Sequence, residues 1–493
     1  MITISSLVFL TFDERNRKRG LAVKAAVRPA VAVLLLWMAA VISSTGQTFK
    51  SLVSFDANDG GNVYAGLVQA TNGNFYGTTY AGGISNRGTV FQVNSAGKLS
   101  TVYNFCSQNG CVDGDSPVSG LTLAANGTLY GTTSLGGVDG NGTIFSISPS
   151  GKMTTLHSFS GTDGAKPYGG LVQGTNGDLY GTTFAGGIQG QGTVFEFSLS
   201  GTLTTLHSFC SDFLVCPDGQ VPEGTLLQVS NGTFYGTTAF GGENQSGAIF
   251  SITPAGSLTT VYSFCRKVNC ADGESPFAGL AQDNAGNVYG TTNQGGANGA
   301  GSVFKLTAAG ALTTLHNFCP QSGCADGSYP DAGLILATDG NLYGTTAAGG
   351  TGSGTAFKIT PQGKLTTLHS FAGTDGSDPF GPLVQATNGI FYGTTYTGGA
   401  NASYGTVFSL ANGLAPFAAL VPTSGKVGAT IIILGSNLTQ TTSVAFNGKA
   451  ATFTVVSASE IKATVPSGAT SGKVKVMTPG AVLTSNVPFR VTH

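Results

Sequence analysis

Short apolar runs separated by turn residues recur along most of the chain, with no helical period. The clearest marker is the string Tyr-Gly-Thr-Thr, which begins at seven positions: Tyr76, Tyr130, Tyr180, Tyr235, Tyr289, Tyr343 and Tyr392. The spacings between them are 54, 50, 55, 54, 54 and 49 residues. A period of about 50 residues is typical of one four-stranded blade of a β-propeller. The pattern therefore predicts an all-β fold built from seven tandem units.

Each unit contains four short runs with the length and polarity of strands, named A to D here in chain order. In the first unit they cover residues 66–71, 74–80, 88–93 and 98–105. Asn-Gly or Asp-Gly stands between A and B in six of the seven units. These dipeptides accept the positive φ of a tight hairpin turn, which supports an antiparallel pairing of A with B.

The two ends of the repeat array complement each other. A D-type strand, Thr48 to Phe55, precedes the first unit, whereas the seventh unit ends after its C strand at residues 405–410. The N-terminal strand would complete the last unit and cover two sheet edges that otherwise invite aggregation. We predict a seven-bladed β-propeller closed by this strand, and an open β-solenoid is the alternative.

Antiparallel strands place the A–B and C–D turns on one face of such a ring and the D–A and B–C connections on the other. The turns of the first face are minimal, while the connections of the second face vary in length and sequence. Loops on a rigid scaffold are where recognition usually resides. Any functional site is therefore predicted on the D–A and B–C face.

All eight cysteines lie in D–A connections as four local pairs: Cys106 with Cys111, Cys210 with Cys216, Cys265 with Cys270, and Cys319 with Cys324. The spacings of 54 or 55 residues contain a pair, and those of 49 and 50 do not. In an exported chain each pair is predicted to form its own disulfide, which pins an inserted loop and adds about 2 kcal/mol of stability. Zinc is the alternative, but a four-cysteine site needs two converging pairs and these pairs belong to different units.

An Asp-Gly pair recurs in all seven D–A connections, always eight residues before the leucine of strand A. The aspartates are Asp59, Asp113, Asp163, Asp218, Asp272, Asp326 and Asp375. One interpretation is a ring of carboxylates for calcium or a cationic ligand. Because calcium needs several oxygen ligands close together, Asx turns that cap local backbone N–H groups are the favoured interpretation.

Two further sets of side chains recur at equivalent positions. Strand D carries a histidine in four units and tyrosine or valine in the others, which favours a structural role over catalysis or metal binding; the histidines are His157, His207, His316 and His369. An aromatic residue precedes strand A in four units: Tyr64, Tyr168, Phe277 and Phe380. Stacking on sugars at the mouth of a central channel is one role for them, and packing between units is the favoured one.

Composition narrows the partners and the location. Only 9% of residues are charged and the formal net charge is −1, without a basic stripe, which argues against nucleic acid. Basic residues through Arg28 precede the apolar run Ala30–Ile42, and Gly46 stands before a cleavage position at Gln47. This pattern predicts a secretory signal and no membrane span after cleavage. An uncleaved anchor is the weaker alternative, because the apolar run is short for a span.

The chain lacks the sequence motifs of the commonest catalytic sites. No Gly-x-Ser-x-Gly, His-Glu-x-x-His or phosphate-binding Gly-Lys-Ser/Thr string is present. The units differ mainly in loop length, whereas an active site normally breaks the symmetry of a repeat. We therefore predict no catalytic residue, no metal and no cofactor. Carboxylates from distant units could still assemble on the D–A and B–C face, so an enzyme acting on polysaccharide stays an alternative.

The recurring pattern G-L-V-x-A-x-N-G-x-x-Y-G-T-T, followed by G-G, G-T-V-F and L-T-T-L-H-S-F, resembles the GloVer tandem-repeat family of exported bacterial proteins. The resemblance covers residues 48 to about 413 and is repeated seven times. It implies a secreted or surface protein without an assigned activity, of a kind that often carries a C-terminal sorting or anchoring region. We recognise no terminal hydrophobic anchor with a basic tail in this chain.

Residues 415–493 resemble an IPT/TIG domain, which has an immunoglobulin-like fold. The motifs are Pro422-Thr423-Ser424-Gly425, Gly428, IIILGSN at 431–437, VAFNG from Val444, ATVP from Ala463, TPGA, Ser485-Asn486 and Phe489. Alternating apolar positions in the same region predict a small β-sandwich without the resemblance. The resemblance implies an extracellular adhesive or spacer role.

The predicted domains are a signal segment at 1–46, the propeller at 47–413 and the sandwich at 414–493. We expect an exported protein, secreted or at the cell surface, that acts as a binding or scaffold module for an extracellular glycan or protein without evident catalysis. The alternatives are an extracellular enzyme acting on polysaccharide and a purely structural surface protein. The candidate binding residues are the seven aspartates with Tyr168, Phe277 and Phe380.

Overall fold

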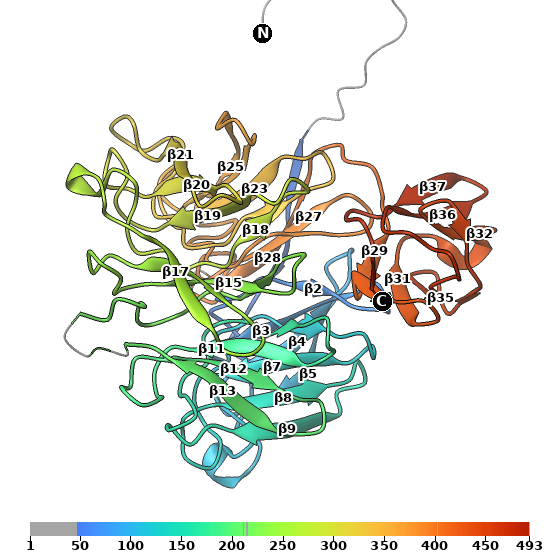
Figure 1. Ribbon diagram of the computed structural model, residues 1–493, viewed down its shortest axis with the longest axis horizontal. Coiled ribbons are helices and arrows are strands. Elements are labelled where there is room, and N and C mark those ends of the chain that lie inside the picture. Colours follow the sequence, from blue (N-terminus) through green and yellow to red (C-terminus); the bar gives the residue numbers. More distant parts are fainter. Residues whose placement is uncertain (1–46, 211, 213–214, 402, 493) are drawn as a thin grey trace, which may run out of the picture. The chain divides into compact units, whose positions relative to one another are not determined.

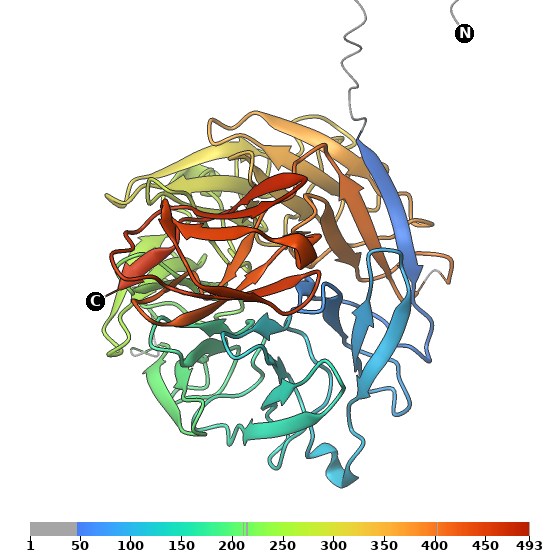
Figure 2. The same cartoon turned by 90° about the vertical axis from the view of Figure 1, so that its right-hand side faces the viewer.

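The computed structural model describes residues 47–210, 212, 215–401 and 403–492. The predicted signal segment lies outside the described residues. Residues 47–493 form one compact unit, and its main body is a series of four-stranded antiparallel sheets (Figure 1). Figure 2 shows these sheets arranged around a common centre, as in a propeller. The all-β, propeller-like prediction is thereby confirmed.

Four types of strand build the sheets in the order A-B-C-D. The A strands are β2 (Val68–Gln69), β6 (Thr122–Leu123), β10 (Val172–Gln173), β14 (Leu227–Gln228), β18 (Ala281–Gln282), β22 (Ile335–Leu336) and β26 (Val384–Gln385). The B strands are β3 (Phe75–Thr79), β7 (Leu129–Thr133), β11 (Leu179–Thr183), β15 (Phe234–Thr238), β19 (Val288–Thr292), β23 (Leu342–Thr346) and β27 (Phe391–Thr395). The C strands are β4 (Thr89–Val93), β8 (Thr143–Ile147), β12 (Thr193–Phe197), β16 (Ala248–Ile252), β20 (Ser302–Leu306), β24 (Thr355–Ile359) and β28 (Thr406–Ala411). The D strands are β5 (Leu99–Asn104), β9 (Met153–Ser158), β13 (Leu203–Ser208), β17 (Leu258–Ser263), β21 (Leu312–Asn317), β25 (Leu365–Ser370) and β1 (Thr48–Ser54).

The N-terminal strand completes the last sheet of the series, as the ends of the array predict. β1 pairs antiparallel with β28 in register from Thr48 opposite Ala411 to Ser54 opposite Thr406. The sheet order is β1-β28-β27-β26, which repeats the D-C-B-A order of the other sheets. Strands remote in sequence therefore form one sheet. The edge of β28 that the seventh unit alone would leave open is covered by β1.

The tyrosine and glycine of the repeated Tyr-Gly-Thr-Thr string serve packing. Tyr76 of β3 is fully buried and packs in one cluster with Leu129 and Phe145 of the next sheet. Gly77 leaves no room for a side chain, because a Cβ there would lie 2.6 Å from the ring of Phe91. The glycine thus lets the phenylalanine of strand C cross over strand B, and the tyrosine joins adjacent sheets.

The first threonine of the string ties each sheet to its neighbour. Its hydroxyl donates to a backbone carbonyl just before the next A strand, as from Thr78 Oγ1 to the Ser119 carbonyl at 2.8 Å. The same bond recurs from Thr132 to Pro167, Thr182 to Gly224, Thr237 to Ala278, Thr291 to Ala332 and Thr345 to Pro379. Thr394 of β27 donates to the Ala65 carbonyl at 2.8 Å, which joins the last sheet to the first.

The C-terminal region forms separate sheets around a core of its own. Its strands are β29 (Ala419–Val421), β30 (Ser424–Lys426), β31 (Thr430–Leu434), β32 (Ser443–Phe446), β33 (Lys449–Ala450), β34 (Phe453–Val455), β35 (Glu460–Thr464), β36 (Val474–Thr478), β37 (Ala481–Thr484) and β38 (Arg490–Thr492). Two four-stranded sheets, β29-β31-β35-β34 and β33-β32-β36-β37, enclose an apolar cluster that includes Ile433, Phe446 and Val476. Three 3₁₀ turns complete the described elements: η1 (Asn109–Cys111), η2 (Val268–Cys270) and η3 (Leu438–Gln440). Within the described residues, no helix has the length and apolar character needed to cross a membrane.

Candidate active site

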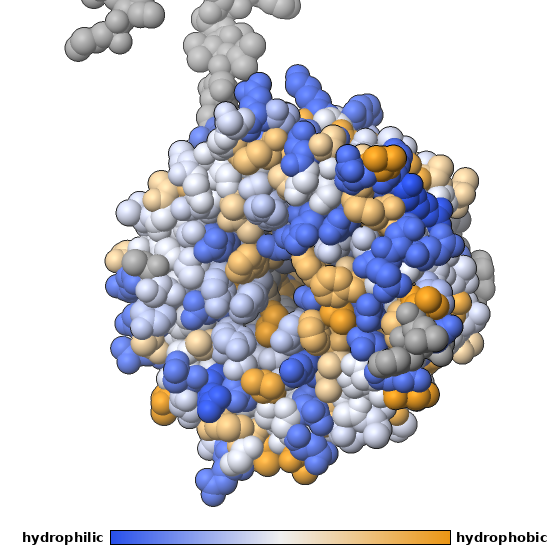
Figure 3. Space-filling model, turned by 90° about the vertical axis from the view of Figure 1, so that its left-hand side faces the viewer, coloured by the Kyte–Doolittle hydropathy of each residue, from blue (hydrophilic) through white to orange (hydrophobic). Residues whose placement is uncertain are grey.

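A cavity of about 640 Å³ lies where the D–A connections enter the A strands. Every unit lines it with the residue that stands three positions before the leucine of strand A. These residues, named the pocket ring here, are Tyr64, Val118, Tyr168, Glu223, Phe277, Asp331 and Phe380. A volume in this range is typical of sites for small ligands. Figure 3 shows one face of the molecule hollowed near its centre, with apolar residues around the hollow.

Backbone bonds between units aim the pocket ring inward. The residue two positions before each ring member has a positive φ: Asn62, Ser116, Lys166, Val221, Ser275, Tyr329 and Asp378. Its N–H donates to a B–C connection of the preceding unit, as from Val221 to the Gln191 carbonyl at 2.9 Å. A positive φ is costly for a β-branched residue such as Val221, so the neighbouring unit must hold this backbone in place. The direction of each ring side chain is therefore set by contacts between sheets.

Glu223 and Asp331 are the two acidic members of the pocket ring. Burial raises the pKa of Glu223 to about 7, and the negative charge of Asp331 adds to the shift. Burial also raises the pKa of Asp331 to about 6, with a further contribution from the charge of Asp378. No lysine or arginine of the described chain lines the pocket. The two carboxyl groups thus titrate near neutral pH without a compensating cation.

The two carboxyl groups differ in their hydrogen bonds. Asn293, which is buried and belongs to the preceding unit, donates from its side-chain amide to Asp331 Oδ1. This bond lowers the pKa of Asp331 and offsets part of the effect of burial. Glu223 receives no hydrogen bond from any described residue, and its carboxyl group lines the pocket. Glu223 therefore keeps its proton to a higher pH than Asp331 does.

Aromatic residues occupy four of the seven positions of the pocket ring, and Phe277 stands between Glu223 and Asp331 in the order of the units. The rings of Tyr64 and Phe380 are stacked, with centroids 5.6 Å apart and planes within 14°. Tyr396 supports both of them, at 4.5 Å from Tyr64 and 5.3 Å from Phe380. Tyr168 packs on Phe184 in the same way, with centroids 4.8 Å apart. The supporting rings, Tyr396 and Phe184, each follow a Tyr-Gly-Thr-Thr string. They hold the rings of Tyr64, Phe380 and Tyr168 in place, and the aromatic residues that line the pocket are named the aromatic wall here.

The structure brings Tyr168, Phe277 and Phe380 together in one pocket, with Tyr64 beside them. The sequence analysis missed Glu223 and Asp331, although both occupy the same offset from the strand A leucine as these aromatic residues. Alignment of the seven units would have found them, because both stand three positions before the strand A leucine, where four other units have an aromatic residue.

The seven Asp-Gly aspartates stay in their own connections, where each carboxylate accepts at least one local backbone N–H or stands beside a histidine or tyrosine of strand D. The donors include Asp56 N to Asp59, Tyr103 to Asp113, His157 to Asp163, His207 to Asp218, Tyr262 to Asp272, His316 to Asp326 and His369 to Asp375. The geometry is that of turns capped by a carboxylate. The strand D position therefore supplies a hydrogen-bond partner, which bulk alone does not explain.

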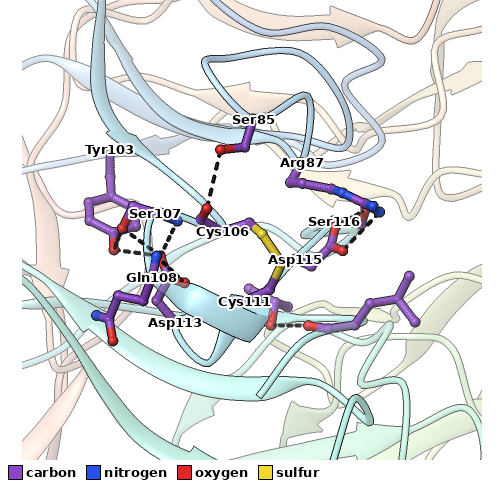
Figure 4. The surroundings of a disulfide bond; sticks show 12 residues. Ser85, Arg87, Tyr103, Cys106, Ser107, Gln108, Cys111, Asp113, Asp115 and Ser116 are labelled. Carbon is purple, nitrogen blue, oxygen red and sulfur yellow. Dashed lines mark hydrogen bonds and ion pairs between the residues drawn. A yellow bond between two sulfur atoms is a disulfide. The ribbon is translucent and has the colours of Figure 1, made fainter. Parts of the chain in front are cut away.

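Four disulfides close the D–A connections at the predicted pairs: Cys106–Cys111, Cys210–Cys216, Cys265–Cys270 and Cys319–Cys324. Figure 4 shows the first of them beside Asp113, whose carboxylate accepts bonds from Tyr103, Ser107 and Gln108. Cys265, Cys270 and Glu274 lie close enough to hold an ion, but both sulfurs are consumed in a disulfide. Disulfides of this kind are typical of an oxidising compartment outside the cytosol.

The sequence model of the Gloeobacter/Verrucomicrobia repeat matches residues 40–230 and 222–455. The chain belongs to this family. The resemblance of the repeats to the GloVer family is thereby confirmed. A comparison with curated proteins finds no match.

Several solved structures are similar to this repeat protein. A gluconolactonase from Xanthomonas campestris is 12% identical over 76% of this chain and 92% of that chain, with a TM-score of 0.38. The periplasmic gluconolactonase of Pseudomonas aeruginosa is 17% identical over 69% and 97% of the two chains, with a TM-score of 0.40. A protein of unknown function from Bacteroides thetaiotaomicron is 13% identical over 74% and 76%, with a TM-score of 0.42.

These findings overturn the expectation of a binding or scaffold module without evident catalysis. Two of the similar solved structures are described as gluconolactonases, at 12% and 17% identity. The pocket contradicts the reasoning behind the expectation, because Glu223 and Asp331 break the symmetry of the repeat at one equivalent position. The absence of catalytic sequence motifs was poor evidence against catalysis, because Glu223 and Asp331 come from different units and form no local motif.

Proposed function

We propose that this repeat protein is an exported hydrolase that acts on carbohydrate, with Glu223 and Asp331 as its acid and base in the central pocket. The observation that carries the proposal is the pair of raised carboxyl pKa values, about 7 and about 6, inside one cavity. Two carboxyl groups whose environments set their pKa values apart are the usual machinery of glycoside cleavage.

The roles follow from the hydrogen bonds of the two groups, because the Asn293 amide favours the ionised form of Asp331 and Glu223 receives no such bond from a described residue. At about pH 6.5 a large share of Glu223 keeps its proton and can pass it to the leaving oxygen, while most of Asp331 is ionised. Asp331 then has the negative charge needed to take a proton from the attacking water, and Asn293 orients its carboxylate. The chemistry needs no group beyond these side chains and water.

The lining of the pocket supports carbohydrate as the substrate class. Sugar rings combine flat C–H faces, which stack on aromatic side chains, with hydroxyl groups that bond to carboxylates. The stacked Tyr64 and Phe380 and the supported Tyr168 supply the first kind of contact. Glu223 and Asp331 supply the second kind.

The wider architecture is part of the proposal. We take residues 47–413 as a closed seven-bladed propeller, which the return bond from Thr394 to Ala65 and the β1–β28 pairing support. Residues 414–493 would be an IPT/TIG domain of immunoglobulin-like fold, which the two enclosed sheets support. Residues 1–46 would be a secretory signal, and the four disulfides agree with export.

The test is turnover by the purified chain without residues 1–46. Soluble polysaccharides, their oligomers and a gluconolactone are incubated with the parent and with Glu223→Gln, Asp331→Asn and Asp139→Asn. Asp139 is exposed on a B–C connection, so its variant makes the same charge change away from the pocket. We expect a bell-shaped pH profile of kcat/KM between about pH 6 and pH 7 in the parent.

We expect the two pocket variants to lose at least about 100-fold in kcat, and the Asp139 variant to match the parent. Absence of turnover on every substrate in the panel, or turnover that persists in Glu223→Gln and Asp331→Asn, contradicts the proposal. In the first case the purely structural interpretation would gain support.

A further inference from the structure

The charge balance of the central pocket is one-sided. Glu223 and Asp331 line it, Asp378 lies close enough to raise the pKa of Asp331, and no cationic side chain of the described residues faces it. Burial of a carboxylate without a neighbouring cation is unfavourable, and burial therefore raises the pKa of both groups. A ligand that brings a positive charge would remove this penalty, whereas an anionic ligand would increase it.

The aromatic wall favours the same charge. The pocket ring contains Tyr64, Tyr168, Phe277 and Phe380, whose faces attract cations. Tyr396 contacts both Tyr64 and Phe380 and holds their rings in place. A cavity that combines aromatic faces with carboxyl groups that have no cationic neighbour thus suits an ammonium group attached to a flat, partly apolar body.

Resting on the proposed carbohydrate hydrolase, we propose that the pocket selects amino sugars with a free amine over neutral sugars and rejects sugar acids. The ammonium group lies against Asp331, which is mostly ionised at about pH 6.5, and the sugar face stacks on the aromatic wall. Glu223, whose carboxyl group has no hydrogen-bond partner among the described residues, keeps its proton for the leaving oxygen.

Calorimetric titration of the full exported chain with three tetrasaccharides tests this selectivity. The ligands are a glucosamine tetramer with free amines, its fully N-acetylated form and a galacturonate tetramer, which share a similar size but carry positive, neutral and negative charge. At about pH 6.5 we expect the amine form to bind about tenfold or more tighter than the acetylated form, and the galacturonate form most weakly.

Asp331→Asn should bring the amine and acetylated forms within about twofold of each other, because the charge is gone while the shape is kept. Asp139→Asn is the matched control, and it should keep the tenfold preference. Equal affinity of the parent for the amine and acetylated forms, a preference that persists in Asp331→Asn, or no binding of any of the three tetramers overturns the selectivity.

A turnover assay on the same tetramers separates this inference from the proposed function. Cleavage of neutral sugars without a preference for the amine form would refute the selectivity and leave the hydrolase standing. Preferential binding of the amine form without cleavage of any sugar would refute the hydrolase and leave the selectivity standing.

Discussion

Glu223 illustrates how one residue couples function to stability. Its pKa is raised from 4.5 to about 7 in the folded chain, so the folded state holds the proton more tightly than the unfolded state does. Between these pH values the free energy of unfolding falls as the pH rises, and above about pH 7 the loss is complete. The carboxyl group that suits acid catalysis therefore costs stability at the pH of its use.

We predict that Glu223→Gln stabilises the chain at about pH 8 by on the order of 2 kcal/mol and has little effect at about pH 4.5. The glutamine keeps the shape of the side chain and removes the charge that burial opposes. Thermal unfolding of the parent and the variant at both pH values measures the difference. The exposed Asp139→Asn should shift neither transition, and an equal stability of Glu223→Gln and the parent at pH 8 would contradict the burial of this charge.

The residues of the pocket were only partly predictable from sequence. Tyr168, Phe277 and Phe380 stand out because aromatic residues recur before strand A, and the structure places all three in the cavity. Glu223 and Asp331 do not stand out, because a carboxyl group gains its chemistry from burial and from neighbours in other units. The sequence shows that these five residues all stand three positions before the strand A leucine. It does not show that side chains at this position line a cavity.

At the scale of elements, the D–A connections show two ways of holding the same turn. In the third unit, which lacks cysteines, Gly161 has φ +90° and its carbonyl accepts the N–H of Gly187. In the second unit, Cys111 takes the equivalent place with φ 53°, and its carbonyl accepts the N–H of Gly137. The disulfide therefore lets a residue with a side chain occupy a left-handed position that otherwise favours glycine.

We predict that Cys106→Ser with Cys111→Ser costs about 2 kcal/mol in the free energy of unfolding, from the entropy of the closed loop. Cys106→Ser with Cys111→Gly should lose about 0.5–1 kcal/mol less, because glycine accepts the positive φ that serine resists. Chemical denaturation under non-reducing conditions compares both variants with the parent. If the glycine variant is the less stable of the two, the backbone conformation of this position is not what the disulfide maintains.

The strands were largely predictable, and their lengths less so. Strands B, C and D of the first unit were expected at 74–80, 88–93 and 98–105, and β3, β4 and β5 lie inside those ranges. Strand A was expected at 66–71, but β2 contains only Val68 and Gln69. Its first residues follow the backbone that enters the pocket, so they line the cavity rather than pair with strand B.

At the scale of the whole molecule, the pocket depends on the connection between the first and last sheets. Tyr64 of the first unit contacts Phe380 and Tyr396 of the last unit, so the aromatic wall spans the junction. Thr394 donates to the Ala65 carbonyl across the same junction, and β1 supplies the outer strand of the last sheet. A local repeat pattern predicts each sheet, whereas the pocket exists only when the two ends of the array meet.

We predict that deletion of Thr48–Ser54 lowers the thermal stability of the exported chain strongly and promotes aggregation, because the edge of β28 and the cluster around Val53 become exposed. Differential scanning fluorimetry and size-exclusion chromatography compare the deleted chain with the parent. Addition of a synthetic peptide with the sequence of residues 48–55 should restore part of the stability in a dose-dependent way, since it can pair with β28 as β1 does.

A peptide of the same composition in scrambled order is the control for this rescue, because it keeps the charge and hydrophobicity but loses the order of buried and exposed side chains along β1. A deleted chain as stable as the parent would mean that β1 does not hold the last sheet, and the closed ring would then be wrong. Rescue by the native peptide alone would show that the junction is completed by this strand, and recovery of sugar binding in the same sample would show that the pocket forms only when the ring is complete.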